Sequence, residues 1–114
     1  MTEDLFERIV TRTLEELPTE FRELLENVEI LIEPEHDDKP DLYGLYEGIP
    51  LTERHEGSMD MRGPDRVFVF ERPLVDDFGD DPARLAAEIR ITLLHELAHH
   101  FGIGDDRLHE LGWS

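Results

Sequence analysis

The first quarter of the chain carries apolar residues at the spacing of an amphipathic helix. The stripe recurs at helical intervals over residues 5–17, and Pro18 ends it because proline cannot continue a helix. Thr2 is the expected N-cap of this helix. A second, shorter helix is expected from Thr19, with the side chains of Phe21, Leu24 and Leu25 turned inward.

A period-two pattern then replaces the helical one. Residues 28–33 alternate in the manner of a half-buried strand, and residues 34–41 form a polar loop. Residues 43–51 are expected to form two short strands around a glycine-containing turn. Pro50 has no amide proton, so the second of these strands belongs at a sheet edge. The strongest strand signal covers residues 66–71, which are mostly β-branched and aromatic.

One long helix with clear boundary signals follows. Asp81 and Pro82 form a favourable N-cap and first-turn pair, and the helix is expected to run to about Phe101, where Gly102 can end it. A last helical turn is expected around residues 108–111. The order helix, helix, strands, helix has no regular βαβ alternation. It predicts an α+β fold in which a small mixed or antiparallel sheet packs against two or three helices.

The composition narrows both the class of protein and its partners. The length of 114 residues suits a single domain over residues 1–114, and 39% of the residues are hydrophobic, enough for a small core. The net charge of −18 disfavours binding to nucleic acid and to anionic membranes, and it favours binding to cations or basic partners. The absence of cysteine excludes disulfides, thiol nucleophiles and cysteine-based zinc fingers. The acidic N-terminus and the lack of a long apolar run predict a cytoplasmic protein without a membrane span.

The strongest chemical signal is the run from His95 to His99, which reads HELAH and lies on the long predicted helix. Helical residues four apart are turned by only about 40° from each other, so both imidazoles can bind one tetrahedral zinc ion. Glu96 projects beside the metal, where it can take a proton from a water molecule that the metal activates. His100 is rotated by about 100° from the metal face, which favours packing or exposure over catalysis.

A third zinc ligand has to come from beyond this helix. Gly102 permits a sharp turn, and Asp105 then offers a carboxylate within six residues of His99. Asp105 or Asp106 could instead cap the final turn, and in an extended chain the side chain of Asp106 faces away from that of Asp105. His109 is a further alternative, provided that the last turn packs over the metal. We expect Asp105 to be the third ligand.

The stretch from His95 to Asp105 has the form His-Glu-x-x-His-x-x-Gly-x-x-Asp, which resembles the signature of zincin metallopeptidases. The whole chain resembles the minimal zincin-like metallopeptidases, a family of small bacterial intracellular proteins, and the stretch 44–54 adds to the match. The resemblance implies that His95, His99 and Asp105 bind Zn²⁺ and that Glu96 is the general base. It also implies a small sheet packed against two or three helices.

The leading hypothesis is a zinc-dependent hydrolase, a small metallopeptidase that acts on a peptide or protein. Its substrate could pair with an exposed sheet edge near residues 45–51. The alternative is a non-catalytic, zinc-containing module that binds a basic protein through its acidic surface. Glu96 discriminates between them, because a structural zinc site has no use for a glutamate beside its ligand. Tyr43 and Tyr46 are expected to pack in the core or hairpin rather than to polarise a substrate carbonyl.

Overall fold

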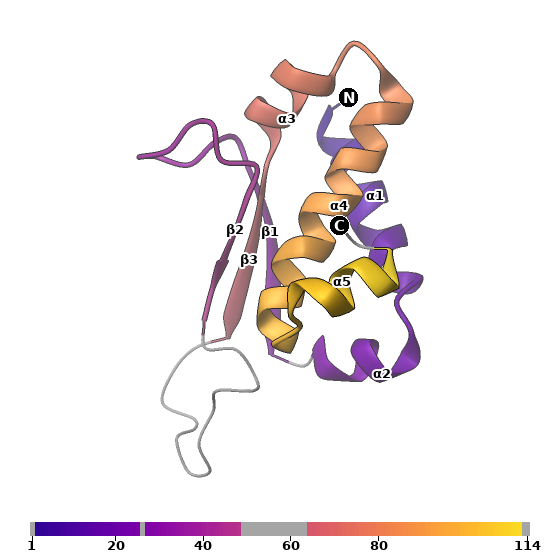
Figure 1. Cartoon of the computed structure of the whole chain (residues 1–114). Helices are drawn as coiled ribbons and strands as arrows, with labels where there is room; N and C mark the ends of the chain where they lie inside the picture. Colours follow the sequence, from indigo (N-terminus) through magenta and orange to yellow (C-terminus); the bar gives the residue numbers. More distant parts are fainter. Residues whose placement is uncertain (1, 26, 49–63, 113–114) are drawn as a thin grey trace.

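The computed structural model describes residues 2–25, 27–48 and 64–112, and the side chains of all of these except residues 2–4 and 105. The elements in chain order are α1 (Thr2–Glu15), α2 (Thr19–Arg22), the 3₁₀ turn η1 (Glu23–Leu25), β1 (Val28–Glu33), β2 (Gly44–Glu47), β3 (Asp65–Phe70), α3 (Glu71–Phe78), α4 (Pro82–Phe101) and α5 (Asp105–Leu111). Figure 1 shows the three strands side by side, with α1 and α4 beside one another and next to the sheet. No helix in these ranges is both long enough and apolar enough to cross a membrane.

The sheet is mixed, and its strand order is β1-β3-β2. β1 runs parallel to β3, from Val28 opposite Asp65 to Glu33 opposite Phe70. β2 runs antiparallel to β3, with Leu45 opposite Phe68. Within the described sheet, β2 is therefore an edge strand. The predicted α+β fold, a small mixed sheet packed against helices, is confirmed.

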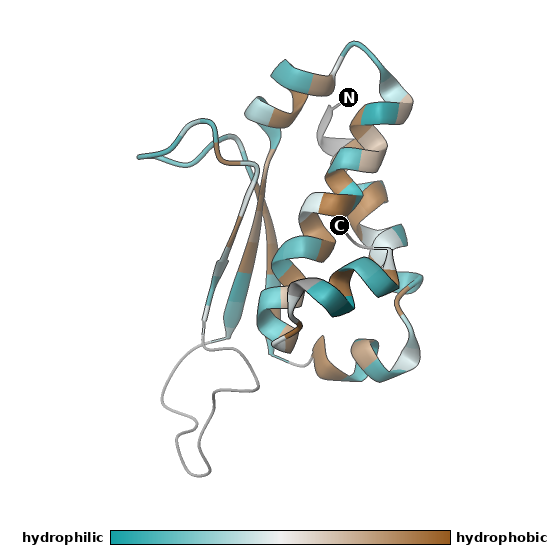
Figure 2. Ribbon diagram, in the orientation of Figure 1, coloured by the Kyte–Doolittle hydropathy of each residue, from teal (hydrophilic) through white to brown (hydrophobic). Residues whose placement is uncertain are grey.

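A single apolar core fills the space between the sheet and the helices. Val67 and Val69 on β3, Leu93 and Leu97 on α4, and Phe6 on α1 all belong to it and are fully buried. Figure 2 shows apolar positions along β3 and along α4 where these two elements face each other. Alternate residues of β3 reach this core, because successive side chains of a strand point to opposite faces, and Val28, Ile30 and Ile32 of β1 pack against it.

The boundaries of α4 agree with the prediction at both ends. The carboxylate of Asp81 accepts a hydrogen bond of 3.2 Å from the backbone N–H of Arg84, and Pro82 occupies the first turn. Gly102 adopts a left-handed conformation with φ of 73°, which a glycine reaches without steric cost. The helix that carries the motif is thus fixed in length, and the chain turns immediately after Phe101.

The helical predictions are wrong in three details. Thr2 lies within α1 rather than before it. Leu24, expected to face inward, has 41% of its surface exposed because the second helix continues as a 3₁₀ turn that rotates this side chain outward. The sequence also gave no expectation of α3, which begins at Glu71. Pro73 is the third residue of α3, where an N–H has no partner within the helix, so proline is tolerated.

The strand predictions are close but not identical to the structure. The half-buried strand over residues 28–33 is confirmed. The strand expected at residues 66–71 begins and ends one residue earlier, because Glu71 already belongs to α3. Of the two strands expected within residues 43–51, the structure contains β2, and residues 49–51, with Pro50, lie outside the described ranges.

Candidate active site

His95 and His99 lie one turn apart on the exposed side of α4, whereas Leu97 and Ala98 between them are buried in the core. The centroids of the two imidazole rings are 5.4 Å apart, and the ring planes are inclined by 74°. Two imidazoles that bind one tetrahedral zinc ion at about 2.0–2.1 Å have ring centroids about 5 Å apart. The geometry of the pair therefore fits a shared zinc ion with little change in the helix.

Glu96 has different surroundings from the two histidines. Its side chain is 15% exposed, against 55% for that of His99, and its Oε1 lies 4.0 Å from His99 Nε2. Burial raises the pKa of the Glu96 carboxyl, and the nearby His99 and His95 oppose that rise. A carboxyl in such an environment holds a proton more readily than an exposed glutamate, which suits it to proton transfer.

Strand β2 passes directly over this part of α4 because it contains Gly44. A Cβ atom at Gly44 would lie 2.7 Å from Thr92 Cγ2 and 3.0 Å from Glu96 Cγ, closer than side chains normally pack. Gly44 therefore belongs to β2 and permits the close approach of two elements. This approach places the carboxyl-bearing side chain of Glu96 between the helix and the sheet.

The segment expected to supply the third ligand forms a helix. α5 begins at Asp105, so the backbone there is helical rather than extended, and Gly104 is its N-cap. The alternative, in which Asp105 or Asp106 is the N-cap of this turn, is therefore wrong. The side chain of Asp105 lies outside the described part, and within that part no three His, Asp or Glu side chains form a group able to hold a metal. Asp106 and His109 are both exposed, and the identity of the third ligand stays a prediction.

A buried polar network, missed by the sequence analysis, lies beneath the site. His100 Nδ1 is 2.7 Å from Asp65 Oδ2, and the two side chains are only 1% and 2% exposed. The other ring nitrogen of His100 lies 3.0 Å from the carbonyl oxygen of Leu24. Since a carbonyl can only accept, this Nε2 carries a proton. Of the two alternatives expected for His100, packing or exposure, the structure shows packing.

Tyr46 extends the network to one of the candidate ligands. Its hydroxyl donates a hydrogen bond of 2.8 Å to Asp65 Oδ2. Its ring is nearly parallel to that of His99, with an interplanar angle of 10° and a centroid distance of 6.2 Å. Tyr46 therefore packs, as expected. Its ring lies between the sheet and the motif helix. Nothing in the sequence links Asp65 to His100, which lies 35 residues away.

Tyr43 lies away from the histidines, at the start of β2. Its hydroxyl donates a hydrogen bond to Asp77 Oδ2 on α3, and this bond, with burial and the Asp77 charge, raises the pKa of Tyr43 to about 12. Its ring packs against Phe78, at a centroid distance of 5.7 Å. Tyr43 thus connects the start of β2 to α3 through a hydrogen bond and a ring contact. It packs in the fold, as expected.

Comparison with known families agrees with the site. Residues 25–113 match the family of zincin-like metallopeptidases, and the matched region includes all three strands and the whole of α4. The chain belongs to this family. Membership implies a metallopeptidase with a peptide or protein substrate, and zinc is the metal typical of such proteins. A search of curated proteins gave no match.

Proposed function

We propose that this protein is a zinc-dependent peptidase in which His95 and His99 bind the metal and Glu96 transfers protons. The observation that carries the proposal is the pairing of two exposed imidazoles, with centroids 5.4 Å apart, with a largely buried glutamate on the same turn of helix. A structural zinc site needs the two histidines but not the glutamate. The arrangement therefore favours catalysis over a purely binding role.

The residues divide the work of hydrolysis between them. Zinc, when bound, supplies Lewis-acid chemistry that polarises a carbonyl group and makes a water molecule acidic. Glu96 accepts the proton of the attacking water and delivers it to the leaving amine, a role that typically contributes about 10²–10⁴-fold in rate. The absence of a side chain at Gly44 leaves room for Glu96 beneath β2, since a Cβ there would lie 3.0 Å from Glu96 Cγ.

The free edge of β2 offers a place for the substrate backbone. β2 pairs with β3 on one side only within the described sheet, so its other edge presents backbone donors and acceptors from Gly44 to Glu47. An extended peptide can add to such an edge as a further strand. Because Tyr46 stacks on His99, a peptide at this edge lies beside the motif helix.

Metal analysis and a cleavage assay with a peptide library test the proposal together. Wild-type protein is expected to bind about one zinc per chain, and H99A is expected to bind far less. E96Q is expected to keep its zinc and lose hydrolysis, because its side chain keeps its shape but cannot accept the proton. Equal zinc contents in wild type and H99A would refute the metal site. Zinc retained with no cleavage of any peptide would favour the non-catalytic binding module.

We also propose Asp105 as the third ligand, supported by its position three residues after the helix-ending Gly102. D105A is expected to weaken zinc binding far more than D106A or H109A, measured by competition with a chelator. The two control variants lie on the same short helix, so they also report any general effect of altering α5. A larger loss in H109A would assign the third ligand to the last turn instead.

A further inference from the structure

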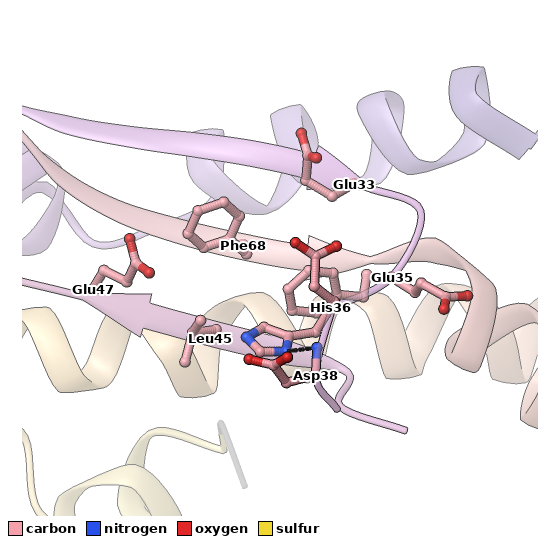
Figure 3. Close-up of a pocket in the computed structure, with 9 residues that line it drawn as sticks. Glu33, Glu35, His36, Asp38, Leu45, Glu47 and Phe68 are labelled. Atoms are coloured by element: carbon pink, nitrogen blue, oxygen red, sulfur yellow. Dashed lines mark hydrogen bonds between the residues drawn. The ribbon is translucent and has the colours of Figure 1, made fainter. Parts of the chain in front are cut away.

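The face of the sheet turned away from the helices contains a hollow of about 250 Å³. Its floor is formed by Phe68 and Phe70, whose rings are parallel and 5.9 Å apart, together with Leu45. His36 closes one end, with its ring edge-on to Phe70 at 5.8 Å. Figure 3 shows Glu33, Phe68 and Leu45 across the three strands, with Glu47 toward the opposite end from His36.

The walls of this hollow are predominantly acidic. Glu33 and Glu47 stand on the two edge strands, Asp37 and Asp38 lie on the loop between β1 and β2, and no Lys or Arg lines the hollow among the described residues. Glu35 alone among the lining acids forms an ion pair with a described basic residue. An apolar floor with unpaired carboxylates around it complements a side chain with a long apolar stem and a cationic head, that is, arginine or lysine.

The hollow lies next to the edge where we place the substrate backbone. Along β2, Gly44 and Tyr46 face the motif helix, and Leu45 and Glu47 face the hollow. A peptide strand at the free edge of β2 would lie about 4.8 Å away, with every second side chain on the outer face beside Leu45 and Glu47. Long side chains reach diagonal neighbours about 7–8 Å away on the adjacent strand, so an outward arginine or lysine can reach the rim of this hollow at Leu45 and Glu47.

We infer that the outer hollow is a specificity site, which selects substrates with arginine or lysine at an outward-facing position of the strand paired to β2. This inference rests on the proposed function only for the placement of the peptide at that edge. The side chains between these outward-facing positions point toward the motif helix, so they do not need to be arginine or lysine. Selection thus comes from the face of the sheet opposite to the candidate catalytic residues.

A binding experiment separates this inference from catalysis. Zinc-supplemented E96Q, which keeps the whole site but cannot turn over, is titrated with fluorescent extended peptides that carry either arginine or citrulline, the uncharged analogue of similar shape, at alternate positions. The arginine peptide is expected to bind about three- to ten-fold more tightly in low salt, and added salt should remove most of the difference. Equal binding of the two peptides, or no binding of either, would overturn the inference.

Matched variants locate the effect on the sheet. E47Q in the E96Q background removes the carboxylate of β2 beside the hollow and should abolish most of the preference for arginine. E20Q removes one exposed carboxylate from the helical side of the molecule and should leave the preference intact. The same loss in both would assign the preference to the net charge and overturn the inference. If the preference behaves as expected but wild-type protein cleaves none of these peptides, the proposed function fails and the specificity site stands.

Discussion

Three polar residues of α4 have very different surroundings, although they lie within five positions of each other. His99 is exposed, Glu96 is largely buried beneath β2, and His100 is fully buried against Asp65. Each step along a helix turns the side chain by about 100°, so neighbouring residues reach different environments. The helix thereby separates the proposed metal ligand on the open side, the proposed proton-transfer residue beneath the strand, and a structural pair in the core.

The pair of Asp65 and His100 is expected to be essential for stability. D65A would leave a buried imidazole and the Tyr46 hydroxyl without the acceptor they share, which typically costs about 3–5 kcal/mol of unfolding free energy. E29A is the matched control, since Glu29 pairs with Arg66 at 3.3 Å but both side chains are about half exposed. The free energy of unfolding of E29A should fall by less than about 1 kcal/mol. Urea denaturation measures both, and similar losses would show that the buried pair adds no more stability than an exposed one.

Between elements, the contact of β2 with α4 depends on the missing side chain of Gly44. G44A would bring a methyl group to 2.7 Å from Thr92 Cγ2, and such overpacking typically costs about 1–3 kcal/mol. T92S removes that methyl group from the helix, so the double variant G44A/T92S is expected to recover part of the loss. G104A is the control, since nothing lies within 4 Å of a Cβ there. A double variant no more stable than G44A would show that Thr92 is not the obstacle.

The hydrogen bond between Tyr43, at the start of β2, and Asp77 on α3 is expected to respond to pH. The pKa of Tyr43 is raised to about 12, so the fold favours the protonated phenol. The stabilisation it brings is complete below about pH 10, the ordinary pKa of tyrosine, and is lost as the pH rises from there towards 12. The tyrosinate absorbance of wild type minus that of Y43F follows this titration. D77A should move it to lower pH and D76A should not, and equal curves would disprove the role of Asp77.

The accuracy of sequence-based prediction differs from one element to the next for physical reasons. The ends of α4 were predictable because Asp81 and Gly102 act locally, through a cap and a left-handed residue. The close approach at Gly44 and the pairing of Asp65 with His100 were not, because each depends on contacts between residues more than thirty positions apart. The two histidines and Glu96 were predictable as candidates because helical spacing alone brings them together.

For the whole molecule, the region that defines the family and the region that forms the core are not the same. The family match begins at residue 25, so α1 lies outside it. The side chain of Phe6 on α1 is nevertheless fully buried in the same core as Leu93 and Leu97 on α4. The helix that carries the candidate catalytic residues therefore depends on packing from a segment that the family match does not include.

Truncation of Phe6 tests this dependence. F6A is expected to lower the free energy of unfolding by about 3–5 kcal/mol, because it removes a buried ring and leaves a cavity next to α4. That is a large part of the roughly 5–15 kcal/mol by which a domain of this size is stable. L24A is the matched control: Leu24 is 41% exposed, and its carbonyl contact with His100 does not involve its side chain, so the loss should be below about 1 kcal/mol. Urea denaturation followed by circular dichroism compares the two variants. Losses of equal size would mean that Phe6 contributes no more to stability than an exposed side chain, whereas the expected difference would show that the packing of α1 against this core stabilises the fold.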